Sequence, residues 1–308
     1  MKKKVSVIGS GNVGASLAQM IVQSAIADVV LFDIADGMPQ GKALDISEAC
    51  PLWGSSASII GTNDYSHTEN SDVIVITAGF PRKPGMSRDD LLHANAKVVS
   101  EVTKNTSKIS PDAVIIVVTN PMDVMAQVSM EVSGFGSERV MGMGGILDSA
   151  RFRTFIAWEM SISPEDVEAL VLGGHGDLMV PMPRFTTVKG VPITELISKE
   201  RIDALVERTR HGGAEIVALL KTGSAYYAPA AATYQMVKAV LFDEKRMLPC
   251  SAYLNGQYGK NGIYTGVPVM LGNGGVEKII ELNLNEQERA DFERSVSAVK
   301  LLVEKLNL

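Results

Sequence analysis

Val5-Ser6-Val7-Ile8-Gly9-Ser10-Gly11-Asn12-Val13-Gly14 is the stretch that decides the fold of this chain. Its first four residues are a short β-type run, and Ala15–Ala27 has the apolar spacing of a helix. The G-x-G-x-x-G pattern therefore lies between a strand and a helix. There its glycines permit a tight turn, close approach of a pyrophosphate and close helix–strand packing. Because glycine-rich turns are common, the motif alone is a weak signal for a dinucleotide site.

A carboxylate at the end of the next strand strengthens that signal. Val29–Phe32 is a second apolar run, and it ends at Asp33, 33 − 14 = 19 residues after the last glycine. A carboxylate at about this distance accepts hydrogen bonds from the adenosine ribose and repels the 2′-phosphate of NADP. The alternative is an aspartate that merely caps a turn. We therefore predict NAD as the cofactor, bound by Gly9, Ser10, Gly11, Asn12, Val13, Gly14 and Asp33.

Apolar strands alternate with helical stretches through the first half. The predicted strands are Ala57–Gly61, Asp72–Thr77 and Ala113–Val118, and the predicted helices are Met38–Cys50 and Asp89–Ile109. This alternation predicts an α/β fold with a doubly wound parallel sheet, the Rossmann arrangement. Ligands of such sheets lie beyond the carboxyl ends of the strands. We therefore expect Val118, Thr119, Asn120 and, in the helix after the preceding strand, Asn95 to face the cofactor.

Composition excludes several classes of protein. The chain has 308 residues, 46% of them hydrophobic and 21% charged, with a net charge of −6, which suits one large or two ordinary domains without a nucleic-acid surface. No apolar stretch approaches the roughly 18 residues of a membrane span. The two cysteines form no C-x-x-C, and the four histidines have no metal-ligand spacing. We expect a cytoplasmic protein without a metal, a membrane or a nucleic acid as partner.

Two further patterns follow predicted strands, one of them cationic and the other carrying a candidate acid–base group. Phe80–Arg88 is a loop with prolines and the cations Arg82, Lys83 and Arg88, which is either a solvated surface loop or a lid for an anionic substrate. Gly173-Gly174-His175-Gly176-Asp177 places one imidazole between glycines, as a structural turn or as a proton-transfer group at neutral pH.

A third pattern pairs opposite charges. Asp148 and Arg151 are three positions apart, so on a helix they are neighbours, and a simple ion pair is one interpretation of them.

Several of these motifs resemble the lactate/malate dehydrogenase family. They are Leu147-Asp148-Ser149-Ala150-Arg151, Gly173–Asp177, the glycine fingerprint, Thr119-Asn120-Pro121 and the arginine loop, all in the family's chain order. The resemblance covers nearly the whole chain and is greatest to the lactate-dehydrogenase-like, bacterial branch of the malate enzymes. It implies reversible hydride transfer between (S)-malate and NAD, giving oxaloacetate and NADH, a reaction of the tricarboxylic acid cycle.

The resemblance also implies roles for individual residues. His175 is expected to be the acid–base catalyst, and Asp148 to accept a hydrogen bond from its distal nitrogen. Arg151 is expected to bind the substrate's C1 carboxylate as a bidentate fork, and Arg88 to polarise the reacting oxygen. Asn120 is expected to hold the substrate oxygen and nearby cofactor atoms.

Arg82 bears on the choice of substrate. The resemblance implies that glutamine stands at this loop position in typical lactate dehydrogenases, whereas an arginine pairs with the second carboxylate of a dicarboxylate. Without that carboxylate, a closed site holds a desolvated, unpaired charge. The alternatives are a lactate or other 2-hydroxy-acid dehydrogenase and a non-enzymatic NAD-binding sensor. The sensor leaves Arg82, Arg88, Asp148, Arg151 and His175 without a role.

The second half predicts a domain of mixed architecture. We expect an NAD-binding Rossmann domain over 1–145 and an α+β catalytic domain over 146–308. The second domain's expected elements are a hairpin in Phe185–Ile193, a helix Glu200–Lys221 interrupted at Gly212-Gly213, a helix Ala230–Phe242, antiparallel strands Met247–Leu254 and Ile263–Leu271, and a closing amphipathic helix Asn285–Leu306. Alanine-rich and apolar helix faces, with the resemblance, predict a homodimer or homotetramer.

Overall fold

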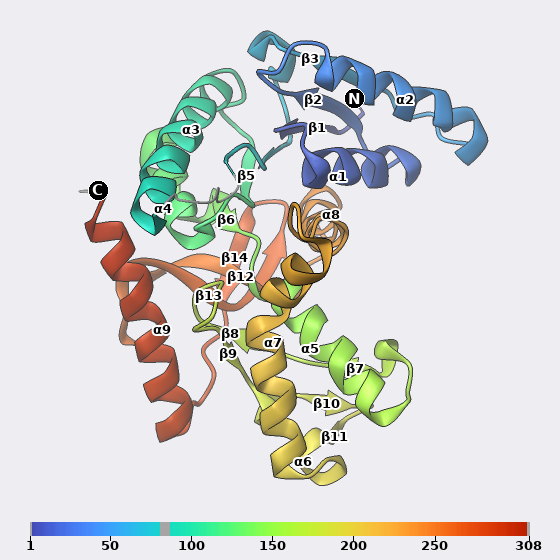
Figure 1. The fold of residues 1–308 in the computed structure, drawn as a ribbon. Helices are drawn as coiled ribbons and strands as arrows, with labels where there is room; N and C mark the ends of the chain where they lie inside the picture. The colour runs from blue at the N-terminus through green and yellow to red at the C-terminus, as the bar shows by residue number, and fades with distance from the viewer. Residues whose placement is uncertain (1, 81–86, 307–308) are drawn as a thin grey trace.

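The computed structural model describes residues 2–80 and 87–306. Within them the main sheet has nine strands in the order β14-β13-β12-β6-β5-β4-β1-β2-β3 (Figure 1). The first six strands in chain order pair in parallel, as a Rossmann sheet does. They are β1 (Lys4–Ile8), β2 (Asp28–Phe32), β3 (Ile59–Thr62), β4 (Val73–Ile76), β5 (Val114–Val117) and β6 (Val140–Gly142).

The central strands form because their residues are β-branched and suit burial on both faces. β4 reads VIVI and β5 reads VIIV, and all eight side chains are buried. Figure 1 shows α3, α4 and α9 on one side of this sheet and α1 and α8 on the other. The helices of the described residues that exceed one turn are α1 (Asn12–Gln23), α2 (Met38–Trp53), α3 (Arg88–Ile109), α4 (Met122–Ser133), α5 (Gly145–Met160), α7 (Lys199–Leu220), α8 (Tyr227–Leu241) and α9 (Glu286–Glu304).

The C-terminal half adds three antiparallel strands to the same sheet. β12 (Arg246–Asn255) pairs with β6 at one residue, and β13 (Asn261–Gly272) and β14 (Gly275–Ile279) follow as a meander. The remainder of this half has its own core around Phe152, Ile156 and Val167. Its short strands are β7 (Val167–Glu168), β8 (Val171–Leu172), β9 (Val180–Pro181), β10 (Thr187–Val188) and β11 (Val191–Pro192), with the short helix α6 (Ile193–Leu196).

The predicted doubly wound fold is confirmed, and one predicted feature of the second half is wrong. α7 runs without a break through Gly212-Gly213, where we expected an interruption. Gly212 serves packing instead, since a Cβ on it falls 3.0 Å from Cδ of Arg151. α1 ends four residues before the predicted Ala27, because Ala25 has a left-handed φ of 52°.

Close contact between β3 and α2 generates a stability prediction. A Cβ on Gly61 falls 2.0 Å from the carbonyl oxygen of Pro39, whereas one on Gly41, the fourth residue of α2, meets nothing within 4 Å. Gly61→Ala should therefore destabilise the protein by about 1–3 kcal/mol through overpacking. The matched control Gly41→Ala should stabilise it by roughly 0.5–1 kcal/mol, the usual helix preference for alanine. Thermal unfolding followed by circular dichroism tests both, and a Gly61→Ala protein that melts no earlier than the parent contradicts the packing.

Candidate active site

Asp148 lies at the centre of a buried polar triad. It is in the first turn of α5 and only 1% exposed. Its Oδ2 lies 2.8 Å from Nδ1 of His175, and its Oδ1 accepts a hydrogen bond of 3.0 Å from Nη1 of Arg151. The helical ion pair and the histidine contact therefore coexist on one carboxylate. Because Nδ1 faces Asp148, Nε2 is the ring nitrogen available to a substrate.

This arrangement changes the acidity of His175. Burial lowers the pKa of the imidazole, but the charge and hydrogen bond of Asp148 outweigh burial and raise it above the ordinary value of 6.5. Arg151 opposes that rise, and the more distant Asp123 adds to it. Because the folded-state pKa is raised, the stabilisation of the folded protein by this pair is complete below about pH 6.5 and disappears as pH rises through the raised value.

The loop that carries His175 is anchored by three successive main-chain N–H groups. Gly173 forms a bridge with Gly266 on β13, with N–O distances of 2.8 and 3.0 Å. The N–H of Gly174 donates to Oγ of Ser295 on α9 at 2.9 Å. The N–H of His175 donates to Oδ2 of Asp123 on α4 at 2.8 Å. Three elements far apart in sequence thus fix the position of the imidazole.

The side chain of Arg151 lies against α7. It is 13% exposed, and its Nε is buried without a hydrogen-bond partner among the described residues. A buried, unpaired donor is unfavourable unless a ligand satisfies it. A cavity of about 300 Å³ beside Arg151 is lined in part by Phe155, Trp158, Gly212 and Leu219.

The carboxyl edge of the sheet is held together by polar side chains. Oδ1 of Asn95 accepts from the N–H of Phe80 at 2.8 Å, and its Nδ2 donates to the carbonyl of Asn120 at 2.7 Å. Thr119 Oγ1 donates to the carbonyl of Ala78 at 2.7 Å. Asn95 and Thr119 therefore join the loops after β4 and β5, beside the half-buried Val118. The structure brings these predicted residues together, although the Asn95 amide is directed at the main chain.

The glycine turn is shaped for close backbone approach. A Cβ on Gly14 falls 1.9 Å from the carbonyl oxygen of Gly9, while one on Gly11 meets nothing within 4 Å. The turn opens directly into α1, whose first N–H groups lack an i−4 partner and suit an anion.

Asp33 ties β2 to the same turn. Its Oδ2 accepts from the N–H of Ser10 at 2.6 Å and from Ser10 Oγ at 3.0 Å, and its Oδ1 accepts from the N–H of Ala35 at 3.0 Å. The open space at Gly11 and the carboxylate at the end of β2 together fit a dinucleotide.

The side chains of two predicted arginines lie outside the described part of the structure. Arg82 lies outside the described residues. Arg88 begins α3, after a capping box between Ser87 and Asp90, and only its main chain is described.

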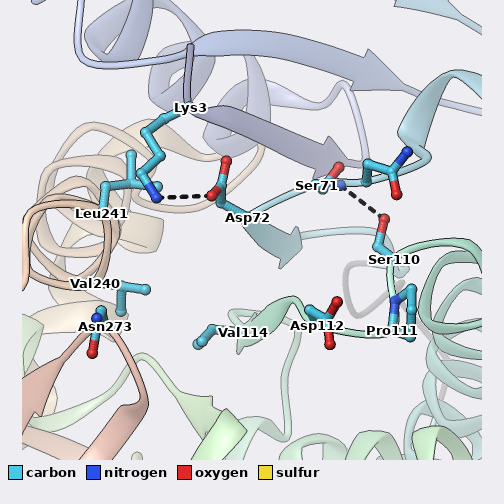
Figure 2. Close-up of a pocket in the computed structure, with 11 residues that line it drawn as sticks. Lys3, Ser71, Asp72, Ser110, Pro111, Asp112, Val114, Val240, Leu241 and Asn273 are labelled. Carbon is cyan, nitrogen blue, oxygen red and sulfur yellow. Dashed lines mark hydrogen bonds and ion pairs between the residues drawn. The ribbon is translucent and has the colours of Figure 1, made fainter. Parts of the chain in front are cut away.

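The opposite, amino edge of the sheet carries a separate polar hollow. Figure 2 shows this cavity of about 230 Å³, with Lys3 and Asp72 on one side and Ser110 and Asp112 on another. Lys3 Nζ donates to Asp72 at 3.0 Å and the N–H of Ser71 donates to Ser110 Oγ at 3.0 Å, so these groups satisfy one another. Chemistry is therefore expected at the other edge, where His175 lies.

Sequence reasoning missed Asp123, Ser251 and Ser295. Asp123 is three residues after the predicted Asn120, so the sheet-edge rule pointed close to it. Ser295 gave no signal, because a serine within an amphipathic helix is indistinguishable from a surface residue until the helix is docked.

A parallel dinucleotide-binding sheet joined to a domain with a buried histidine–aspartate pair defines the class: this is an NAD-dependent oxidoreductase. Comparison with known families agrees. The model of the lactate/malate dehydrogenase NAD-binding domain matches residues 3–142, and that of the alpha/beta C-terminal domain matches residues 146–307. The chain belongs to the lactate/malate dehydrogenase family.

The proteins similar to this chain include malate dehydrogenases and lactate dehydrogenases. A malate dehydrogenase from Roseiflexus castenholzii is 57% identical over 97% of each chain. The solved structure of malate dehydrogenase from Salinibacter ruber is 51% identical, with a TM-score of 0.95 over 99% of this chain and 97% of that one. A lactate dehydrogenase from Cryptosporidium parvum, solved with lactic acid and NAD, is 45% identical, with a TM-score of 0.97 over 100% and 98%. The fold alone therefore does not distinguish the two substrates.

Removing the charge of Asp148 tests the polar triad. Asp148→Asn should reduce NADH turnover with a 2-ketoacid by about 10²–10⁴-fold, because His175 loses the group that favours its protonated form. NADH binding, followed by fluorescence, should be unchanged. Asp203→Asn, which removes an exposed ion pair with Lys199, is the matched control and should leave turnover unaltered. Full activity in Asp148→Asn would show that the triad does not support catalysis.

The α7 glycines generate a second test. A methyl group at 212 falls 3.0 Å from Arg151 Cδ and should shift the arginine side chain by a few tenths of an ångström, whereas at 213 the nearest contact, Arg151 Nη2, is an ordinary 3.7 Å. Gly212→Ala should raise KM for the ketoacid about tenfold, part of the roughly 1.5–3 kcal/mol of a charged hydrogen bond. Gly213→Ala is the control and should leave KM near the parent value. Equal KM values in the two variants would mean that Arg151 does not bind the substrate.

Proposed function

We propose that this protein is an NAD-dependent malate dehydrogenase that interconverts (S)-malate and oxaloacetate. The observation that carries the chemistry is the carboxylate of Asp148 held between His175 at 2.8 Å and Arg151 at 3.0 Å. This arrangement combines a proton-transfer group, His175, with the guanidinium of Arg151, whose buried Nε–H has no hydrogen-bond partner among the described residues. The sequence identity of 56–58% to several malate dehydrogenases supports the choice of malate.

The proton-transfer step follows from the orientation of His175. In the reducing direction its imidazolium donates the Nε2 proton to the C2 oxygen of oxaloacetate, while Nδ1–H stays bonded to Asp148. In the oxidising direction neutral Nε2 accepts the proton of the malate hydroxyl. When bound, NAD would supply the acceptor for the C2 hydride of malate, and NADH the donor for the reverse reaction. Arg151 offers Nε and Nη groups to the C1 carboxylate, and we assign Arg88 to polarise the C2 oxygen.

The residues that fit NAD lie along the carboxyl edge. We assign the pyrophosphate to the turn Gly9–Gly14 at the start of α1, and the adenosine ribose to Asp33. Val118, Thr119 and Asn120 follow β5 on the same edge, and Asn95 holds that loop. The Asp33 carboxylate disfavours the 2′-phosphate of NADP.

We assign selection of a dicarboxylate to Arg82. Two carboxylates balance the arginines at positions 82, 88 and 151 more fully than the single carboxylate of pyruvate does. A lactate dehydrogenase is the competing assignment, because a lactate enzyme shares the fold and 45% of the sequence. The second alternative, an NAD-binding sensor, gives no use to the His175–Asp148 pair.

The setting of the reaction is also a proposal. Cys50 and Cys250 are both free and buried, which agrees with a reducing cytoplasm. Every helix in 2–80 and 87–306 is too short or too polar to cross a bilayer. Within the same ranges no three histidine, cysteine or acidic side chains are grouped to hold a metal ion. We assign its oxidation of malate to the tricarboxylic acid cycle.

We further propose a homodimer or homotetramer. Several large apolar side chains are exposed on the helices, among them Leu52 on α2 at 86% and Trp158 on α5 at 62%. Burial of such side chains between symmetric copies removes them from water.

An NADH absorbance assay with oxaloacetate and pyruvate side by side tests the function and the role of Arg82. The parent should strongly prefer oxaloacetate. Arg82→Gln should lower kcat/KM for oxaloacetate by about 10²–10³-fold, because a buried charged pair costs about 3–5 kcal/mol to break. Pyruvate reduction should improve modestly, since the unpaired charge is gone.

Lys83→Gln is the matched control, because it removes the same charge one residue along the loop, and it should keep the parent's preference. An unchanged ratio in Arg82→Gln would contradict the role of Arg82. A parent that prefers pyruvate would indicate a lactate dehydrogenase, and one that binds NADH without turnover would indicate a sensor.

A further inference from the structure

Asp123 is a buried carboxyl directly beneath the His175 loop, and the proton transfer described above does not use it. It lies in the first turn of α4 and is 4% exposed. Its Oδ2 accepts the main-chain N–H of His175 at 2.8 Å, and its Oδ1 accepts the hydroxyl of Ser251 at 2.6 Å. Ser251 is itself fully buried on β12. One carboxylate therefore joins α4, β12 and the His175 loop.

The loop needs such an anchor because of its composition. His175 stands between Gly174 and Gly176, whose lack of side chains leaves the backbone free to adopt many conformations. A Cβ on Gly174 falls 2.6 Å from Val299 Cγ2 and 3.4 Å from Asp123 Oδ2, so the backbone packs closely against α9 and this carboxylate. The position of the loop therefore depends both on this close packing and on the hydrogen bonds that its main-chain N–H groups donate.

Keeping a carboxylate in this place is costly, and the surroundings offset part of the cost. Burial raises the pKa of Asp123, while the hydrogen bonds from Ser251 and His175 lower it. The N-terminus of α4 provides a favourable dipole for the negative charge. An apolar side chain of similar volume would avoid the desolvation but leave the N–H of His175 unpaired.

We propose that Asp123 is a positioning residue for His175. By accepting the His175 N–H it keeps Nδ1 against Asp148 and Nε2 in the direction of the substrate. This inference rests on the proposed role of His175 in proton transfer. Asp123 is assigned no contact with substrate or cofactor. It acts through the main chain of His175, which is the residue that contacts the substrate.

Two variants separate position from charge. Among the residues of 2–80 and 87–306, charged groups that act on the His175 imidazole include Asp148 and Arg151 on α5 and Asp123 on α4. In Asp123→Asn the amide oxygen still accepts the His175 N–H, and the amide nitrogen donates to Ser251 Oγ in a reversed hydrogen bond, so the loop keeps its acceptor while the negative charge is lost. In Asp123→Ala the acceptor is lost as well. Val128→Ala, a buried truncation on the same helix α4, is the control for general destabilisation.

Hydrogen exchange of the ligand-free protein gives a readout that is independent of turnover. The peptide containing Gly173–Gly176 should exchange faster in Asp123→Ala, because the His175 N–H has lost its acceptor. It should remain protected in Asp123→Asn and in Val128→Ala. Unchanged protection in Asp123→Ala would overturn the proposal.

Kinetics then connect the anchor to catalysis. The rate of oxaloacetate reduction requires protonated His175, so kcat reaches a plateau at low pH. Asp123→Ala should lower that plateau by about 10–100-fold, since a misplacement of about 1 Å can cost about 10²-fold. Asp123→Asn should keep most of the plateau and move the midpoint to lower pH, because a negative charge near the imidazole is gone. NADH affinity should be unchanged in both.

The kinetics overturn the proposal if the plateau in Asp123→Ala equals the parent's, or if it is reduced only as far as in Val128→Ala at equal loss of melting temperature. Equal plateau losses in Asp123→Asn and Asp123→Ala also overturn it, because charge and not position would then be responsible. A parent that is inactive with oxaloacetate refutes the proposed function instead, and the hydrogen-exchange comparison still tests the anchor.

Discussion

The contact between Asp148 and His175 is the interaction on which the rest of the structure depends. A carboxylate that is 1% exposed is tolerated only because two partners, His175 at 2.8 Å and Arg151 at 3.0 Å, satisfy both of its oxygens. The same contact selects the ring nitrogen that remains for the substrate and raises the pKa of the imidazole. Stability and chemistry are therefore coupled at one side chain.

The fold delivers this contact by joining its two halves through the main sheet. β12 and β13 belong to the C-terminal half, yet β12 pairs with β6 of the parallel sheet. β13 in turn holds Gly173 through Gly266, immediately before His175. The His175 loop is consequently fixed to the same sheet as β1, the strand that leads into the glycine turn. A proton-transfer group and a dinucleotide site are thus built on one rigid element, and α5 brings Asp148 to it.

The sequence was sufficient where local pattern determines structure. Periodic β-branched runs and the glycine turn predicted the parallel sheet, and the pair Asp148 and Arg151 was expected to share a helix face. Prediction failed where distant segments decide the outcome. Gly212-Gly213 suggested a broken helix, but α7 is continuous, and Gly212 instead leaves room for the side chain of Arg151, 61 positions earlier (212 − 151). Likewise no local pattern shows that Asp123 and Ser295 meet consecutive N–H groups of one loop.

The most direct test of the central claim is the titration of His175 in the free protein. Histidine-selective isotope labelling gives four imidazole signals, from His67, His93, His175 and His211. The signal of His175 is assigned by its loss in His175→Asn. If Asp148 stabilises the imidazolium as the geometry requires, His175 titrates above its ordinary value of 6.5. A His175 that titrates below that value would show that burial prevails over Asp148, and would contradict the polar triad as the basis of the chemistry.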